Sequence, residues 1–142
     1  MLYFEARKGE PTLTIDTLTT YGTDTKEGLQ RCMNNESFYL RLVKMIPRDP
    51  HFQCLYDALE VGNLTAAFEA AHALKGSTGN LALTPIFAPV SEITELLRAR
   101  VKTDYTPLIE AIRDGQIGFR KSAQIKEPGF LRQQNRTRET CL

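Results

Sequence analysis

The segment NLTAAFEAAHALKGSTGNL, residues 63–81, decides the fold class that we expect for this chain. Asn63 is a preferred N-cap residue, and the residues after it show no strand-like alternation, which predicts a helix from Leu64 to at least Thr78. On a helical wheel of about 100° per residue, small and apolar side chains gather on one side. This predicted buried stripe consists of Ala67, Ala71, Leu74 and Thr78.

The segments on both sides of it carry a similar helical pattern, and capping residues, prolines and glycines separate them. The expected helices are Leu13–Thr20, a segment from Asp24 to about Met33, one between Asn35 and Pro47, one from Asp49-Pro50 to Gly62, one from Thr84-Pro85 to about Arg100, and one after Asp104. In the helix that follows Asn35, periodicity predicts an apolar face. This face consists of Phe38, Leu42, Met45 and Ile46.

Short connections between amphipathic helices favour antiparallel neighbours. We therefore predict an all-α fold for residues 1–120, an up-and-down antiparallel four-helix bundle with one or two short N-terminal helices. Residues 121–142 contain Pro128, Gly129, a polar run and more basic than acidic side chains. This composition predicts a mobile C-terminal tail.

The composition narrows the class of function. With 142 residues, of which 42% are hydrophobic and 25% charged, the chain resembles a single globular domain, which we expect to be a monomer. A net charge of +1 without a basic stripe argues against binding to nucleic acid or to an acidic membrane. The chain has no apolar run of about 20 residues and no signal-peptide pattern, so we expect a cytoplasmic protein. Its three cysteines are widely spaced, and we expect neither a metal site nor a bound cofactor.

The helical wheel places His72 away from the predicted buried stripe, on a face that is exposed to water. The residues that share its face, within about 40°, are Thr65, Gly76 and Gly79, with Phe68 and Lys75 on one flank and Glu69 on the other. Each glycine costs a helix about 1 kcal/mol relative to alanine. We infer that the missing side chains keep the imidazole open to a large partner, and Thr65, Phe68, Glu69 and Gly79 are the candidate docking residues.

An exposed imidazole beside a lysine suits phosphoryl transfer. The pKa of free histidine, near 6.5, leaves a neutral and nucleophilic ring nitrogen at cytoplasmic pH. Lys75, one helical turn after His72, can place an ammonium group near a phosphoryl group on the ring. An exposed pair of this kind contributes only about 0.2–1 kcal/mol, so we expect Lys75 to orient the phosphoryl group more than to tighten its binding.

The sequence HALKGSTGNL, residues 72–81, resembles the signature of histidine-containing phosphotransfer domains, in which leucine, lysine and glycine follow an exposed helical histidine at the second, third and fourth places. YGTDTKEGLQRCMNNESFYLRLVKMI is similar to the first bundle helices of that family, and DALEVGNLTAAFEAAH to its approach to the histidine. The likeness covers about residues 12–115. Ala82 stands where many relatives have glycine.

The resemblance implies a role for each matched residue. His72 would be the phosphorylated residue, Lys75 the cation beside the phosphate, and Gly76 the residue that keeps access open. The implied partners are a hybrid sensor histidine kinase and response-regulator receiver domains, which carry a phosphorylatable aspartate and bind magnesium themselves. The chain would be a phosphoryl carrier without kinase activity of its own.

Two other interpretations remain. The first is the dimerisation helix pair of a histidine kinase. Two features argue against it: Ala73 occupies the place where kinases usually carry an acidic residue, and no glycine-rich nucleotide-binding segment follows. The second is a helical adaptor that binds a receiver or kinase domain without being phosphorylated, because its docking face would look the same. The sequence fits both a stand-alone protein and a piece of a larger hybrid sensor.

Overall fold

The computed structural model describes residues 13–123, and within this range the chain is helical, without a β-strand. The elements are α2 (Ile15–Tyr21), α3 (Thr25–Arg31), α4 (Glu36–Met45), the 3-10 helix η1 (Ile46–Arg48), α5 (His51–Glu60), α6 (Leu64–Asn80), α7 (Thr84–Arg98) and α8 (Thr106–Ala123). Every predicted helix is present, with ends that differ by a few residues. No helix among the described residues is both long enough and apolar enough to cross a bilayer.

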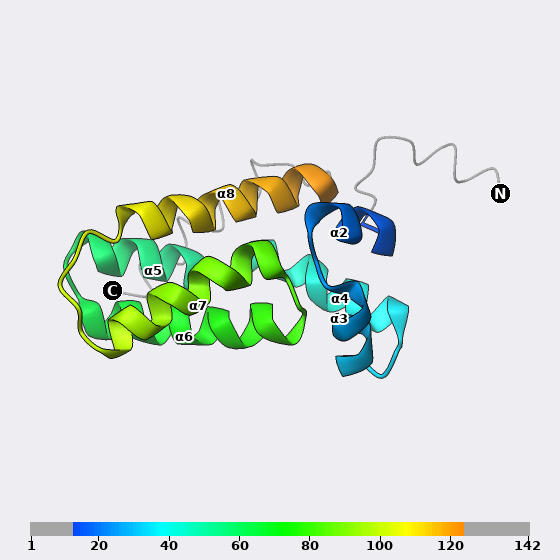
Figure 1. Ribbon diagram of the computed structural model, residues 1–142, viewed down its shortest axis with the longest axis horizontal. Helices are drawn as coiled ribbons and strands as arrows, with labels where there is room; N and C mark the ends of the chain where they lie inside the picture. Colours follow the sequence, from blue (N-terminus) through cyan, green and yellow to red (C-terminus); the bar gives the residue numbers. More distant parts are fainter. Residues whose placement is uncertain (1–12, 124–142) are drawn as a thin grey trace.

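The helices α5, α6, α7 and α8 form a four-helix bundle, and α2, α3 and α4 gather at one end of it (Figure 1). Helix α6 packs against α5 and α7, and α7 packs against α8. The contacts show that α6 and α7 are antiparallel, because Gly79 faces Phe87, whereas Lys75, one turn earlier in α6, meets Glu95, two turns later in α7. The predicted all-α bundle is therefore confirmed.

Three of the predicted helix starts are confirmed by side-chain caps, whereas α5 and α7 begin without one. Asp24, Asn35 and Asn63 each accept a hydrogen bond from the backbone N–H three residues later, at the start of α3, α4 and α6. Each cap satisfies one of the N–H groups that have no partner inside a helix. The predicted buried stripe of α6 is also confirmed, since Ala67, Ala71, Leu74 and Thr78 are completely buried.

The predicted apolar face of α4 was wrong in two of its four residues. Phe38 is 39% exposed and Met45 is 60% exposed, whereas Tyr39 and Val43 are completely buried. The Tyr39 hydroxyl donates a hydrogen bond of 2.8 Å to the carbonyl oxygen of Leu81, which ties α4 to the end of α6. Because this polar contact lies across the fold, the periodicity of α4 alone could not choose between the two neighbouring stripes.

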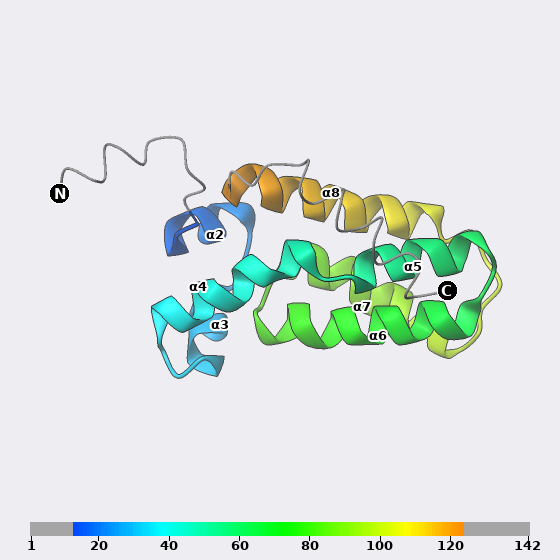
Figure 2. The same cartoon turned by 180° about the vertical axis from the view of Figure 1, so that it is seen from behind.

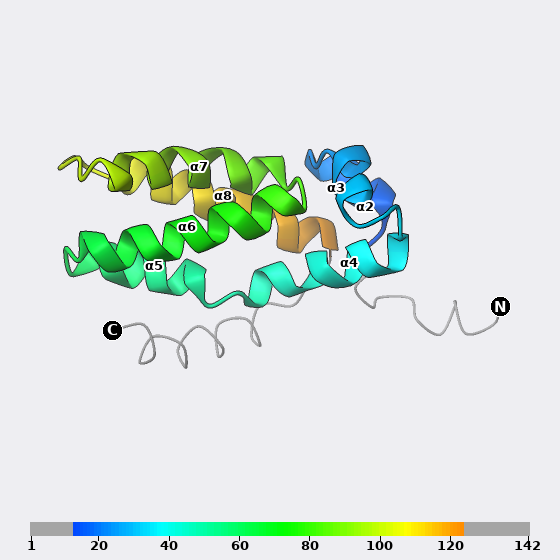
Figure 3. The same cartoon turned by 90° about the horizontal axis from the view of Figure 1, so that it is seen from below.

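Helix α4 continues through η1 into α5, so that the two helices follow one another along one side of the molecule (Figures 2 and 3). Pro47 lies in η1, where its ring interrupts the α-helical hydrogen bonds as the sequence predicted. Helix α2 packs against α8. The N-terminal helices therefore extend the bundle at the end where α6 and α7 are joined (Figure 1).

Helix α8 continues to Ala123, three residues beyond the predicted boundary of the bundle at residue 120. It passes through Gly115 and Gly118 without interruption. A Cβ atom at Gly115 would lie 3.0 Å from the carbonyl oxygen of Pro85, so this glycine permits the close approach of α7 and α8. The predicted mobile tail lies, from residue 124 onward, outside the described residues.

The turn between α6 and α7 contains a residue in the left-handed region, Ala82, with φ of 57°. The N–H of Leu83 donates to the carbonyl of Thr78, and that of Ala82 donates to the carbonyl of Gly79. These two bonds form a Schellman motif, whose left-handed position strongly favours glycine. The departure from the glycine of many relatives thus lies at a position where a side chain is strained.

We expect Ala82→Gly to raise the free energy of unfolding by about 0.5–1 kcal/mol, because glycine adopts this conformation without the steric conflict of a Cβ atom. Urea denaturation of the two proteins measures the difference. Ala111→Gly, at an exposed position within α8, is the matched control and should lose about 1 kcal/mol. A loss of stability in both variants would contradict the strain at Ala82.

Candidate functional site

His72 lies in α6, eight residues before the last residue of that helix, Asn80, and its side chain is exposed to solvent. The predicted exposure of His72 is thereby confirmed. The ring does not stand alone: it stacks on the ring of Phe68, one turn earlier, with 5.6 Å between the ring centroids and 23° between the planes. This contact restricts the imidazole on one side and leaves the rest of the ring to solvent.

An open groove beside His72 is lined by residues of α3, α6 and the start of α7. Its lining residues are Asp24, Glu27 and Arg31 of α3 and its cap, His72, Lys75, Gly76, Gly79 and Asn80 of α6, Ala82 of the turn, and Thr84 and Phe87 of α7. The groove therefore gathers four of the seven residues that the sequence singled out. Thr65, Phe68 and Glu69 do not line it.

Gly76 follows His72 by one turn and gives the groove its open floor. A Cβ atom at Gly76 would have no atom within 4 Å, apart from the backbone of its own helix and its chain neighbours. No packing contact therefore requires glycine at this position. An exposed glycine lowers the stability of a helix by about 1 kcal/mol relative to alanine. No packing contact of Gly76 offsets this loss, and a need for access to His72 would explain the glycine.

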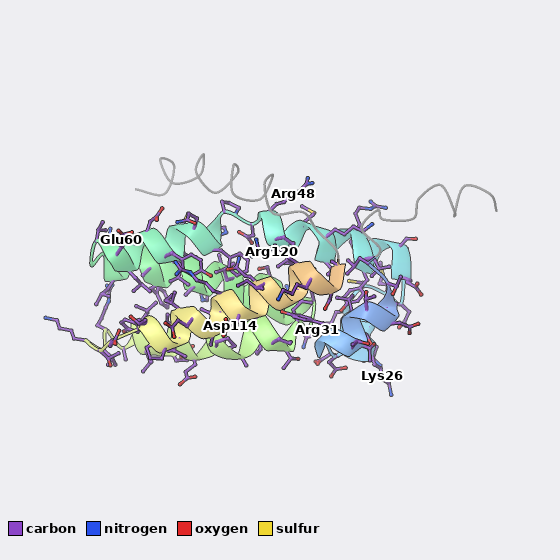
Figure 4. The ribbon with its side chains drawn as sticks, turned by 90° about the horizontal axis from the view of Figure 1, so that it is seen from above. Lys26, Arg31, Arg48, Glu60, Asp114 and Arg120 are labelled. Atoms are coloured by element: carbon purple, nitrogen blue, oxygen red, sulfur yellow. The ribbon has the colours of Figure 1, made fainter. Side chains whose placement is uncertain are left out.

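Gly79 differs from Gly76, because its surroundings provide a structural reason for glycine. A Cβ atom there would lie 2.9 Å from the ring of Phe87, too close for normal packing. Its carbonyl oxygen accepts a hydrogen bond of 2.8 Å from the guanidinium of Arg31, which also pairs with Glu27 at 2.7 Å. Figure 4 shows Arg31 between α3 and the end of the bundle. Gly79 thus joins α3 to α6 and lets α7 approach.

Lys75 forms an ion pair that the sequence did not predict. Its ammonium nitrogen lies 3.0 Å from Oε2 of Glu95 in α7, and the other oxygen of this carboxylate, Oε1, lies 3.2 Å from Nε of Arg98. The hydrogen bond from Lys75, followed by that from Arg98, lowers the pKa of the Glu95 carboxyl from its usual value. The carboxylate is therefore charged at neutral pH, and the pair is lost only as the pH falls through this lowered pKa.

Arg98 connects this ion pair to the histidine. Its guanidinium carbon lies 5.0 Å from the centroid of the Phe68 ring, the same ring that stacks on His72. A guanidinium at this distance from an aromatic ring is attracted to the ring's face. A continuous series of contacts therefore runs over α6 and α7, from Lys75 through Glu95, Arg98 and Phe68 to His72.

The remaining candidate docking residues lie farther along α6. Thr65 is exposed and its hydroxyl accepts a hydrogen bond of 2.8 Å from Arg100, while Glu69 is exposed one turn later. These residues could contact a partner that covers more of α6 than the groove. Among residues 13–123, no three His, Cys, Asp or Glu side chains are grouped so that they could hold a metal ion.

The sequence interpretation did not assign four residues of the site, which are Glu95, Arg98, Arg31 and Phe87. A signal for Glu95 and Phe87 did exist, because α6 and α7 were expected to be antiparallel neighbours with a short turn. Which residues face one another depends on the register between the two helices, and only the structure shows this register. Nothing local marked Arg31, whose contact with Gly79 spans two helices that are distant in sequence.

The comparisons with known proteins give one match. The family model described as "Hpt domain" matches residues 49–118, which contain α5, α6, α7 and most of α8. The matched range includes His72, Lys75, Gly76 and Glu95, and it excludes α2, α3 and α4. No curated protein and no solved structure matches the chain significantly.

Proposed function

Residues 49–118 belong to the Hpt domain family, and on this premise we propose that the chain is a phosphorelay intermediate that carries a phosphoryl group on His72. The family membership implies a role in histidine phosphotransfer. The observation that carries the assignment to His72 is its exposed imidazole beside Gly76, where a Cβ atom would meet open space. The donor and the acceptor are aspartates of receiver domains, and the donor can be part of a hybrid sensor kinase.

The transfer step requires little of this chain beyond the imidazole. The ring nitrogen that lacks a proton attacks the phosphorus atom of the aspartyl phosphate, and an N–P bond forms as the P–O bond to the aspartate breaks. The aspartate leaves as a carboxylate, and the proton on the other ring nitrogen stays there. Return of the phosphoryl group to a second receiver reverses these bond changes.

The surroundings of His72 supply position rather than acid–base chemistry. Phe68 stacks on the ring and limits its rotation, and Lys75 supplies a positive charge on the side of the groove. A phosphoryl group carries close to two negative charges at neutral pH, so an ammonium within reach favours its orientation. The reaction needs space for a whole receiver domain, and the bare backbone at Gly76 provides it.

The proposal extends to the activity, the location, the oligomeric state and the docking surface of the chain. The chain is a carrier and not a kinase, and the magnesium ion of the reaction belongs to the receiver domain. The exchange takes place in the cytoplasm, and the chain acts as a monomer. The groove and the exposed face of α6, with Thr65, Phe68, Glu69 and Gly79, form the docking surface for the receiver.

The test is incubation of the chain with a receiver domain that carries labelled phosphate on its aspartate. We expect label on this protein that is lost in acid and kept in base, the behaviour of a phosphoramidate bond to nitrogen. A protein that binds the receiver without acquiring such label would instead be the non-phosphorylated adaptor. Label that survives acid would indicate modification of a hydroxyl group and would exclude phosphohistidine.

A further inference from the structure

The ion pair of Lys75 suggests a function for Glu95, an inference that rests on the proposed phosphorylation of His72. Lys75 lines the groove together with His72, yet its ammonium contacts the Glu95 carboxylate at 3.0 Å. The side chains of Lys75 and Glu95 are 32% and 53% exposed, so solvent screens the pair and the contact can break at small cost. The cation next to the histidine is thus engaged by a carboxylate of the neighbouring helix.

A phosphoryl group on His72 would compete for the same ammonium. His72 and Lys75 are three residues apart on α6, so their Cβ atoms are about 5–6 Å apart and a flexible lysine can reach the ring. The phosphoryl group carries nearly two negative charges, against one on Glu95. Lys75 can therefore exchange a carboxylate for a more strongly charged partner.

Arg98 makes this exchange possible without leaving Glu95 unpaired. The two oxygens of the carboxylate have different partners, since Oε2 contacts Lys75 and Oε1 contacts Arg98. When Lys75 turns to the phosphoryl group, Arg98 remains 3.2 Å from the carboxylate and still neutralises it. Arg98 in turn lies over Phe68, whose ring supports His72.

We propose that Glu95 is an internal counter-ion that competes with the His72 phosphoryl group for Lys75 and so keeps the phosphohistidine ready for transfer. In the unphosphorylated chain, Glu95 holds Lys75 on the side of α7. In the phosphorylated chain, Lys75 contacts the phosphoryl group, and Glu95 keeps Arg98 as its partner. Glu95 is therefore a positioning residue that acts through Lys75.

The experiment compares the chain with its Glu95→Gln variant in the presence of one receiver domain. The measured quantities are the fraction of label on His72 at equilibrium and the rate at which label is lost after the receiver is removed. We expect the equilibrium constant to shift toward His72 by about 1.5- to fivefold, the range for one exposed ion pair, and hydrolysis to slow in the same variant. The shift should shrink as salt rises from about 0.1 M to 1 M.

Two controls separate this role from general charge and from structure. Glu92→Gln removes the same charge from an exposed position of α7, one turn before Glu95, and should leave the equilibrium unchanged. In a Lys75→Gln background, Glu95→Gln should have a much smaller effect, because the competition for the ammonium no longer exists. A purely structural role of Glu95 would show equal effects in both backgrounds.

The outcomes distinguish this inference from the proposed function. If no variant and no unmodified chain acquires acid-labile label, the phosphorylation of His72 itself is wrong. If the unmodified chain is labelled and Glu95→Gln has the same equilibrium, or a smaller fraction on His72, the competition is wrong and the carrier role stands. An equal shift with Glu92→Gln would reduce the effect to net charge and overturn the specific role of Glu95.

Discussion

His72→Gln is expected to reduce the acid-labile label acquired from a phosphorylated receiver to background. The chain contains two histidines, and His72 is the one exposed beside the groove. Glutamine keeps a polar side chain of similar reach, but its amide nitrogen is not nucleophilic. Because His72 is exposed, the variant should retain its free energy of unfolding within about 1 kcal/mol, the size of the lost stacking on Phe68.

The second histidine provides the matched control. His51 is partly exposed at the start of α5, and its Nδ1 lies 2.6 Å from Oδ1 of Asp49. We expect His51→Gln to acquire label at the same rate and to the same extent as the unmodified chain. Equal labelling of the two variants would assign the phosphoryl group to another residue, and loss in His51→Gln alone would transfer the assignment to His51.

Gly76→Leu is expected to slow transfer from the receiver by on the order of ten- to a hundredfold, since a small displacement of reacting groups has effects of this size. A side chain at Gly76 would project into open space, so the fold should tolerate it. Leucine also raises helix propensity by about 1 kcal/mol relative to glycine, so the variant should be at least as stable. A slower but more stable protein is the result that distinguishes access from folding.

The size of the side chain can be varied to test the same point. Gly76→Ala adds only a methyl group, and we expect most of the gain in stability with a transfer rate within a few-fold of the unmodified chain. The rates come from quenched time courses and the stabilities from urea denaturation. Transfer in Gly76→Leu as fast as in the unmodified chain would show that the open backbone has no role in docking. Gly79 does not offer this test, because Phe87 occupies the space of its side chain.

Three of the variants separate the effects of chemistry, access and electrostatics on phosphoryl transfer. His72→Gln removes the nucleophile, and Gly76→Leu blocks the approach of the partner. Glu95→Gln removes the negative charge that pairs with Lys75. Their expected effects decrease in that order because an absent nucleophile stops the reaction, a steric block impedes docking, and an exposed ion pair is screened by solvent. Each change leaves the buried stripe of α6 intact, so the bundle provides the same frame in all three.

Much of the fold followed from the sequence because the relevant signals are local. Asp24, Asn35 and Asn63 cap their helices as expected, and the buried stripe of α6 follows from its 3.6-residue period. The same period sufficed to place His72 at the surface. Helix α4 was the exception, since two neighbouring stripes were both apolar and the hydrogen bond from Tyr39 to Leu81 selected one of them.

The sequence alone therefore determined the helices, the order of the bundle and the exposure of His72 beside Gly76, since caps and periodicity act within a few residues. The contacts of Lys75 with Glu95, of Arg98 with Phe68, and of Arg31 with Gly79 became visible only in the folded chain. These contacts depend on the register between helices. That register is set by side chains packing across segments far apart in the chain, and no local pattern encodes it.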